Sequence, residues 1–156
     1  MTRLMIALVS LSLFAIACNN GAADGEATEQ KSGSRAPKTK EDSLFHEVME
    51  GHDAGMAKVG RLRKNIDETK HRLDSLDKVP AKKVNAAYKQ SLLDLQAALS
   101  KADTEMFDWM KGFKVDTLSD NKDLRIKYLE EEKAKVMVVK ELIFSALSQA
   151  DSVLKR

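Results

Sequence analysis

The chain has 156 residues, of which 43% are apolar and 32% are charged, with only two prolines and seven glycines. This composition favours long helices over a sheet, and the length leaves room for one domain. The 26 basic residues nearly balance the 24 acidic ones, and the two signs are interspersed. A nucleic-acid-binding surface needs a basic patch, so we expect no nucleic-acid partner.

Residues 1–17 are typical of an export signal. Arg3 supplies a positive charge, and Leu4–Ala17 is a run of apolar and small residues. That run is too short to cross a hydrocarbon core of about 30 Å as a stable helix. It ends in Ala15-Ile16-Ala17-Cys18, which fits either ordinary signal peptidase, cutting after Ala17, or the processing of a bacterial lipoprotein.

Cys18 favours the lipoprotein. It is the only cysteine in the chain, so it cannot form an internal disulfide, and exported proteins seldom keep a free thiol. A small residue directly before Cys resembles the bacterial lipobox. We therefore expect lipid on Cys18 to anchor the chain to a membrane of the cell envelope, preferably the outer membrane, facing the periplasm or the cell surface. Plain secretion is the alternative.

Residues 18–40 form a predicted linker. Asn19–Lys40 contains no aromatic residue and no Val, Ile, Leu or Met. Such a segment cannot bury enough surface to offset the entropy of ordering, so we expect it to be disordered. A flexible chain of this length typically spans about 26 Å, which makes it a spacer between the membrane and the folded domain.

Residues 41–156 carry the folded domain, and its first predicted helix begins near Thr39–Ser43. Thr39 and Asp42 have the spacing of a capping pair. Pro80 ends the helix because it pushes Val79 out of the α region. The inward-facing positions recur in steps of three and four: Val48, His52, Gly55, Val59, Leu62, Ile66, Thr69, Leu73 and Leu76.

The second helix has the same spacing. Pro80 suits its first turn, where a missing N–H costs little. Gly112 suits a left-handed C-cap, with Phe113 folding back as its hydrophobic partner. The inward-facing positions are Tyr88, Leu92, Leu95, Leu99, Ala102, Met106, Trp109 and Phe113.

The third helix follows a short polar loop, Lys114–Leu118. Ser119 or Asp120 is its predicted N-cap, and Asp123 lies in its first turn, where a negative charge is favoured. The inward-facing positions are Leu129, Glu132, Val136, Val139, Ile143, Ala146, Ala150 and Val153.

These patterns predict an all-α fold. Short connections make neighbouring helices antiparallel, so we expect an elongated up-down-up three-helix bundle with coiled-coil-like packing. A helical hairpin that dimerises through the same positions is the alternative. Three segments, Phe45–Lys58 (FHEVMEGHDAGMAK), Ala102–Phe113 (ADTEMFDWMKGF) and Tyr128–Lys133 (YLEEEK), resemble small lipoproteins of the Bacteroidota that often carry the label "viral A-type inclusion protein". The resemblance covers about residues 44–155, implies an outer-membrane or cell-surface location, and assigns no activity.

Folding the helices back on one another predicts which residues meet. A turn at Pro80 pairs positions whose numbers add up to about 160, which places His52 opposite Asp108, beside Met106 and Trp109. A turn within Lys114–Leu118 uses a sum of about 232, which places Met106 near Ile126. One end of the bundle should therefore gather histidine, methionine and aromatic side chains.

This cluster has two interpretations. Thioether and imidazole ligands favour Cu(I) or Ag(I), and an indole face can stabilise a bound cation. The candidate metal ligands are Met49, His52, Met56, Met106 and Met110, with Trp109, Asp53, Asp108, Tyr128 and Glu132 as supporting residues. Haem is a further alternative. The simpler interpretation is packing, with His52 hydrogen-bonded to Asp108 or Glu132, and Glu132 paired with a lysine or with His52.

We expect no enzyme, because the sequence lacks a phosphate-binding loop, a nucleophile elbow and a free cysteine nucleophile if Cys18 is acylated. The leading functional expectation is a membrane-anchored helical interaction or scaffold module that contacts another envelope protein. That role predicts exposed apolar residues, for which Met110, Phe113 and Leu118 are candidates. A periplasmic copper-binding protein is the alternative.

Overall fold

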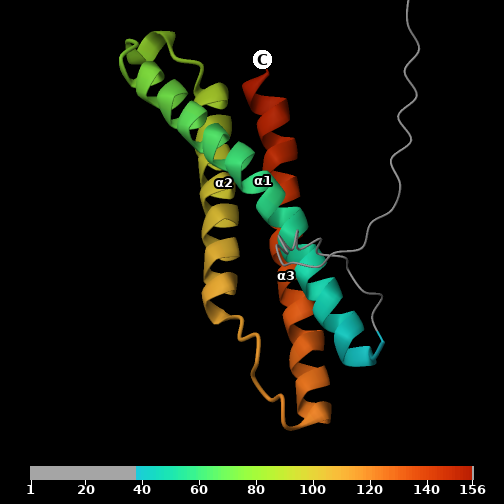
Figure 1. The fold of residues 1–156 in the computed structure, drawn as a ribbon. Helices are drawn as coiled ribbons and strands as arrows, with labels where there is room; N and C mark the ends of the chain where they lie inside the picture. Colours follow the sequence, from blue (N-terminus) through green and yellow to red (C-terminus); the bar gives the residue numbers. More distant parts are fainter. Residues whose placement is uncertain (1–37, 156) are drawn as a thin grey trace, which may run out of the picture. The chain divides into compact units, whose positions relative to one another are not determined.

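The computed structural model describes residues 38–155, so the predicted export signal, Cys18 and nearly all of the linker lie outside the described residues. Three long α-helices make up this part of the chain: α1 (Lys40–Asp77), α2 (Ala86–Gly112) and α3 (Lys122–Leu154). A short 3₁₀ helix, η1 (Ala81–Lys83), lies between α1 and α2. Each helix packs against the other two (Figure 1). The predicted all-α three-helix bundle is confirmed.

The helices run up, down and up. Ion pairs between α1 and α3 join Lys40 to Glu130, Glu47 to Lys133, and Arg61 to Asp151. The residue numbers of the paired residues increase in the same direction along both helices. Therefore α1 and α3 are parallel, and α2 is antiparallel to both. The start of α1 therefore lies at the same end of the bundle as the α2–α3 connection (Figure 1).

Both ends of α1 follow from local sequence. The Thr39 hydroxyl accepts a hydrogen bond from the Asp42 N–H, and the Asp42 carboxylate accepts one from the Thr39 N–H, each at 3.1 Å. This reciprocal pair satisfies two N–H groups that the first turn leaves without partners. The helix ends at Asp77, before the residue that Pro80 keeps out of the α region. The predicted capping pair and stop are confirmed.

The predicted start of α2 is wrong. Pro80 precedes η1, and α2 begins only at Ala86 with Asn85 as its N-cap. The Asn85 side-chain oxygen accepts a hydrogen bond from the Tyr88 N–H at 3.0 Å. A side-chain acceptor at the N-cap stabilises a helix start more than a proline at its first position does, because proline satisfies no N–H group.

The predicted caps around the second connection are also wrong. Gly112 is the last residue of α2, but it has no positive φ, and Phe113 leaves the helix in an extended conformation. Ser119 and Asp120 belong to turns, and Asn121 caps α3 by accepting the Leu124 N–H at 3.2 Å. Asp123 does lie in the first turn of α3, as predicted.

The predicted inward-facing positions form the core. The fully buried side chains come from all three helices and follow the spacing of three and four. They include Val48, Leu62, Leu92, Leu95, Leu99, Met106, Leu129, Val136 and Ile143. Thr69 is buried as well, and its hydroxyl donates to the Asn65 carbonyl at 2.7 Å, which satisfies the polar group inside its own helix.

The predicted register is confirmed between α1 and α2. The His52 ring lies beside Trp109, and Arg72 donates to the Tyr88 hydroxyl at 3.1 Å. The register predicted between α2 and α3 is wrong, because Trp109 lies against Glu132 and Phe113 against Tyr128. Relative to the prediction, α3 is displaced along α2 by about two and a half turns.

The α2–α3 connection accounts for this displacement. It does not turn back at once but runs along the first turns of α3 (Figure 1). The Lys114 N–H donates to the Tyr128 hydroxyl at 2.7 Å, and Arg125 donates to the Thr117 carbonyl at 3.0 Å and to the Val115 carbonyl. Because the connection packs against α3, the end of α2 meets α3 well above its first turn.

Candidate functional site

Four aromatic rings form a stack at the end of the bundle that carries the α2–α3 connection. Phe113 occupies the centre, with ring centroids 5.1 Å from Trp109, 6.1 Å from Tyr128 and 6.4 Å from Phe45. These separations are typical of favourable aromatic pairs. The aromatic stack joins α1, the end of α2 and the start of α3, and it explains why Phe113 is partly buried instead of exposed.

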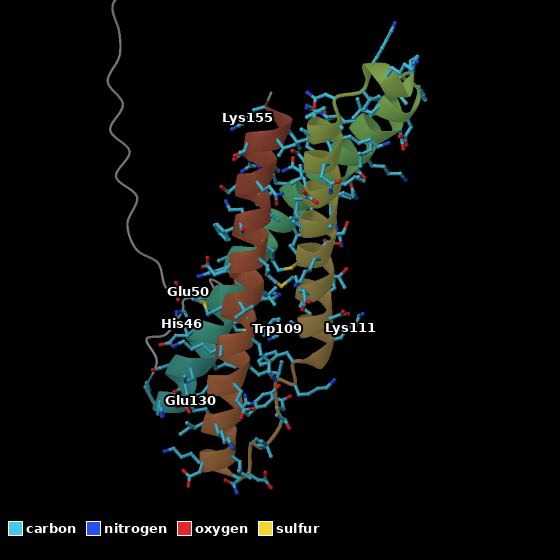
Figure 2. All side chains as sticks on the ribbon, turned by 180° about the vertical axis from the view of Figure 1, so that it is seen from behind. His46, Glu50, Trp109, Lys111, Glu130 and Lys155 are labelled. Atoms are coloured by element: carbon cyan, nitrogen blue, oxygen red, sulfur yellow. The ribbon has the colours of Figure 1, made fainter. Side chains whose placement is uncertain are left out.

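Trp109 and Glu132 form the polar centre of this region. The indole N–H donates to the Glu132 carboxylate at 2.9 Å, and both residues are buried. Figure 2 shows Trp109 between α2 and α3. The second carboxylate oxygen accepts a bond from the Lys135 ammonium at 2.7 Å. This bond raises the pKa of Lys135 above its ordinary value, because it favours the charged ammonium. The predicted pairing of Glu132 with a lysine is confirmed.

His52 borders the aromatic stack but does not join this hydrogen-bond network. Its ring centroid is 5.8 Å from that of Trp109, and its Nδ1 lies 2.8 Å from the carboxylate of Asp53. The predicted bond from His52 to Asp108 or Glu132 is wrong. Asp108 is exposed and pairs with Lys111 at 2.9 Å, and Glu132 is already bound to Trp109 and Lys135.

The five candidate metal ligands do not share one environment. Met106 is fully buried, and its methyl group occupies the space that a side chain on Gly55 would take. Met49, His52 and Met56 are half-buried, whereas Met110 is 37% exposed on the outer side of α2. The contacts of Met106 are those of a core side chain, which supports the packing interpretation.

Within residues 38–155, no three side chains of the histidine, cysteine, aspartate and glutamate types converge as they would around a metal ion.

Sequence reasoning missed Arg125. This residue is buried at the start of α3, where it binds the carbonyls of Val115 and Thr117 and the carboxylate of Glu41 at 3.2 Å. Its position was readable, since it lies four residues before Leu129 and extends the inward-facing spacing by one turn. A charged residue at an inward-facing position indicates a buried ion pair or side-chain hydrogen bonds to the backbone of a loop.

Exposed apolar side chains lie in three parts of the described chain. The tip surface consists of Val115, Leu118 and Leu124, which are 50%, 38% and 48% exposed, whereas Met110 is exposed on α2. Val79 and Leu93 are 38% and 44% exposed near the α1–α2 connection, which we call the Pro80 end. The outer α3 surface consists of Met137, Val138 and Phe144. Met110 and Leu118 are exposed as predicted, and Phe113 is not. The residues on α3 were missed because they flank the inward-facing positions.

Comparisons with protein-family models, curated proteins and solved structures found no match to this chain. The resemblance to Bacteroidota lipoproteins therefore stays a prediction. None of the helices in residues 38–155 combines the length and apolar character that a membrane crossing requires.

Proposed function

We propose that the chain is a membrane-anchored bacterial lipoprotein whose helical bundle is a non-catalytic interaction module. The outer α3 surface carries this proposal. Val138 is 61% exposed and Phe144 is 42% exposed. Beside them is a shallow depression of about 410 Å³, lined by Met137, Val138, Glu141, Leu142 and Ser145. Contiguous exposed apolar surface of this kind is typical of protein–protein contact sites.

The charge of this surface indicates the chemistry of its partner. Among the exposed residues from Met137 to Ser152, only Glu141 is charged. The outward side of α1 is different, because Glu50, Asp53, Lys58 and Arg61 are all exposed there. A partner for the outer α3 surface therefore needs an apolar face, such as one side of an amphipathic helix in another envelope protein.

The interaction is tested by photocrosslinking in living cells. A photoreactive residue at Val138 should give a discrete crosslinked product, and one at Thr104, which is exposed on α2, should not. The product from Val138 should disappear in a Phe144→Lys background, because a charge would have to be desolvated at the contact. Equal products from Val138 and Thr104, or none from Val138, would contradict an interaction through α3.

The anchor rests on the sequence around Cys18. Replacing this residue by alanine should abolish incorporation of labelled fatty acid and release the protein from membranes. Two or more acyl chains on one cysteine hold a protein far more firmly than a single chain does. Membrane association that persists in Cys18→Ala would contradict lipidation at this position.

A soft-metal binder is the second candidate. The observation that favours it is the position of His52 against Trp109, one turn of α2 away from Met106. A Cu(I) or Ag(I) site there should quench the fluorescence of Trp109, the only tryptophan, saturably at micromolar metal. The quenching should be lost in His52→Gln. Fluorescence that does not change with added metal would leave packing as the role of these residues.

A further inference from the structure

The tip surface differs from the outer α3 surface in what surrounds it. It lies at the end of the bundle formed by the α2–α3 connection and the first turn of α3 (Figure 1). Two of its residues, Val115 and Leu118, belong to the connection itself, and Leu124 follows in the first turn of α3.

Arg125 determines how the connection presents its side chains. It draws the carbonyls of Val115 and Thr117 inward, which satisfies polar groups that would otherwise need water. The apolar side chains of Val115 and Leu118 stay partly exposed to solvent. Leu118 has a φ of 59°, a left-handed conformation that is rare for a residue of this kind. The chain thus holds a leucine outward at a strained position.

Charged residues of both signs flank these apolar side chains. From Lys111 to Lys127 the chain has five basic residues and three acidic ones. Four lysines and three aspartates of this segment are exposed, and the fifth basic residue, Arg125, is buried. Lysines beside exposed apolar side chains favour contact with anionic lipid headgroups.

The chain that precedes the bundle joins it at this end. Lys40 begins α1, and Glu41 is bonded to Arg125. The residues between Cys18 and Lys38 can extend to about 70 Å at most, and a flexible chain of that length would typically span about 25 Å. Because the typical span is about half the length of α3, which is about 50 Å, an anchor at Cys18 favours an arrangement in which the tip surface is nearer to the bilayer than the Pro80 end.

We propose that the tip surface rests on the phospholipid headgroup layer of the membrane that carries the anchor. Val115 and Leu118 enter the interfacial region, and the exposed lysines face lipid phosphates. This inference rests on the proposed anchor at Cys18. It implies that the bundle stands on the membrane with the Pro80 end directed away, and it gives the bundle a fixed orientation toward a partner.

The test uses the single cysteine of the chain. In the full-length acylated protein Cys18 is blocked, so an introduced cysteine is the only reactive thiol. Val115→Cys and Val79→Cys are a matched pair, because both replace exposed valines in connections at opposite ends of the bundle. Each is labelled with a polarity-sensitive fluorophore and reconstituted into vesicles of phosphatidylethanolamine and phosphatidylglycerol, with and without brominated acyl chains.

The expected result is a blue-shifted emission at position 115 with about twofold or greater quenching by brominated lipid, and no quenching at position 79. Equal quenching at the two positions, or quenching at 79 alone, would overturn the inference while leaving the anchor intact. Labelling of the protein without an introduced cysteine would reveal a free thiol at Cys18 and overturn the proposed anchor instead. Circular dichroism of both variants confirms that each is folded.

Discussion

The two connections of the bundle are built in different ways. The α1–α2 connection is a local turn in which Pro80 stops one helix and Asn85 starts the next. The α2–α3 connection lies against α3, bound by Arg125 and Tyr128. A local turn lets two helices align by their facing apolar side chains alone. A connection that packs against a helix occupies part of the length of that helix. It therefore shifts this helix along its neighbour.

Replacing the arginine at each end should give the largest difference between the two regions. Arg125→Met leaves the Val115 and Thr117 carbonyls and Glu41 without their buried donor, and we expect a loss of about 3 kcal/mol in the free energy of unfolding. Arg72→Met removes bonds to Tyr88 and Glu68 that are partly exposed, and should cost about 1 kcal/mol. Urea denaturation measures both. Equal losses would show that the second connection is not held by its arginine.

The close approach of α1 to its neighbours gives the next largest effect. A side chain at Gly55 would meet the methyl group of Met106 and Ile143, whereas one at Gly60 would meet nothing within 4 Å. Gly55→Leu should therefore destabilise the bundle by about 2 kcal/mol through overpacking. Gly60→Leu should stabilise it by about 0.5 kcal/mol through helix propensity. A common sign for the two changes in denaturation midpoint would contradict the observed packing.

The bond between Trp109 and Glu132 tests the α2–α3 register. Trp109→Phe removes the donor and leaves a buried carboxylate oxygen unpaired, which should cost about 1–2 kcal/mol. In a double-mutant cycle with Glu132→Leu, the two changes should be coupled by about 1 kcal/mol. Strict additivity of the two free energies would show that these side chains are not in contact.

The smallest expected effect is a pH dependence at the Pro80 end. The hydrogen bond from Arg72 holds the pKa of Glu68 below its ordinary value. A carboxylate with a depressed pKa stabilises the fold above its unfolded pKa and loses that contribution as pH falls through the folded value. Stability should therefore fall as pH drops below about 4.3, the ordinary glutamate pKa. The decline should be shallower in Glu68→Gln, as thermal denaturation across this range would show; an unchanged slope would contradict the assignment.

The sequence predicted the helices and their inward faces because periodic apolar burial is a local and repeated signal. Val48, Leu95 and Val136 each occupy a position that the spacing assigned to the core. Caps were harder to predict, since Asn85 and Asn121 each compete with nearby residues that can also end or begin a helix. A helix begins after the candidate N-cap residue whose side chain accepts a hydrogen bond from a backbone N–H of the first turn.

The candidate site could be predicted in detail only where it depended on the α1–α2 register. That register placed His52 beside Trp109 correctly. Tyr128 and Glu132 were also predicted to lie near the cluster, and they do. Their exact register could not be deduced, because Arg125 and Tyr128 bind backbone groups of the connection, and the spacing of apolar residues does not reveal such bonds. A buried arginine close to a loop is the one signal in this sequence that could have warned of the displacement.

The left-handed leucine in the α2–α3 connection has a practical consequence. A non-glycine residue with a φ of 59° carries strain of about 1–2 kcal/mol. Glycine would relieve that strain and lose about 0.5–1 kcal/mol to the added freedom of the unfolded chain. Leu118→Gly should thus delete a large, partly exposed side chain without a net loss of folding free energy. Any loss of membrane contact in that variant would report on the leucine side chain alone, independently of the stability of the bundle.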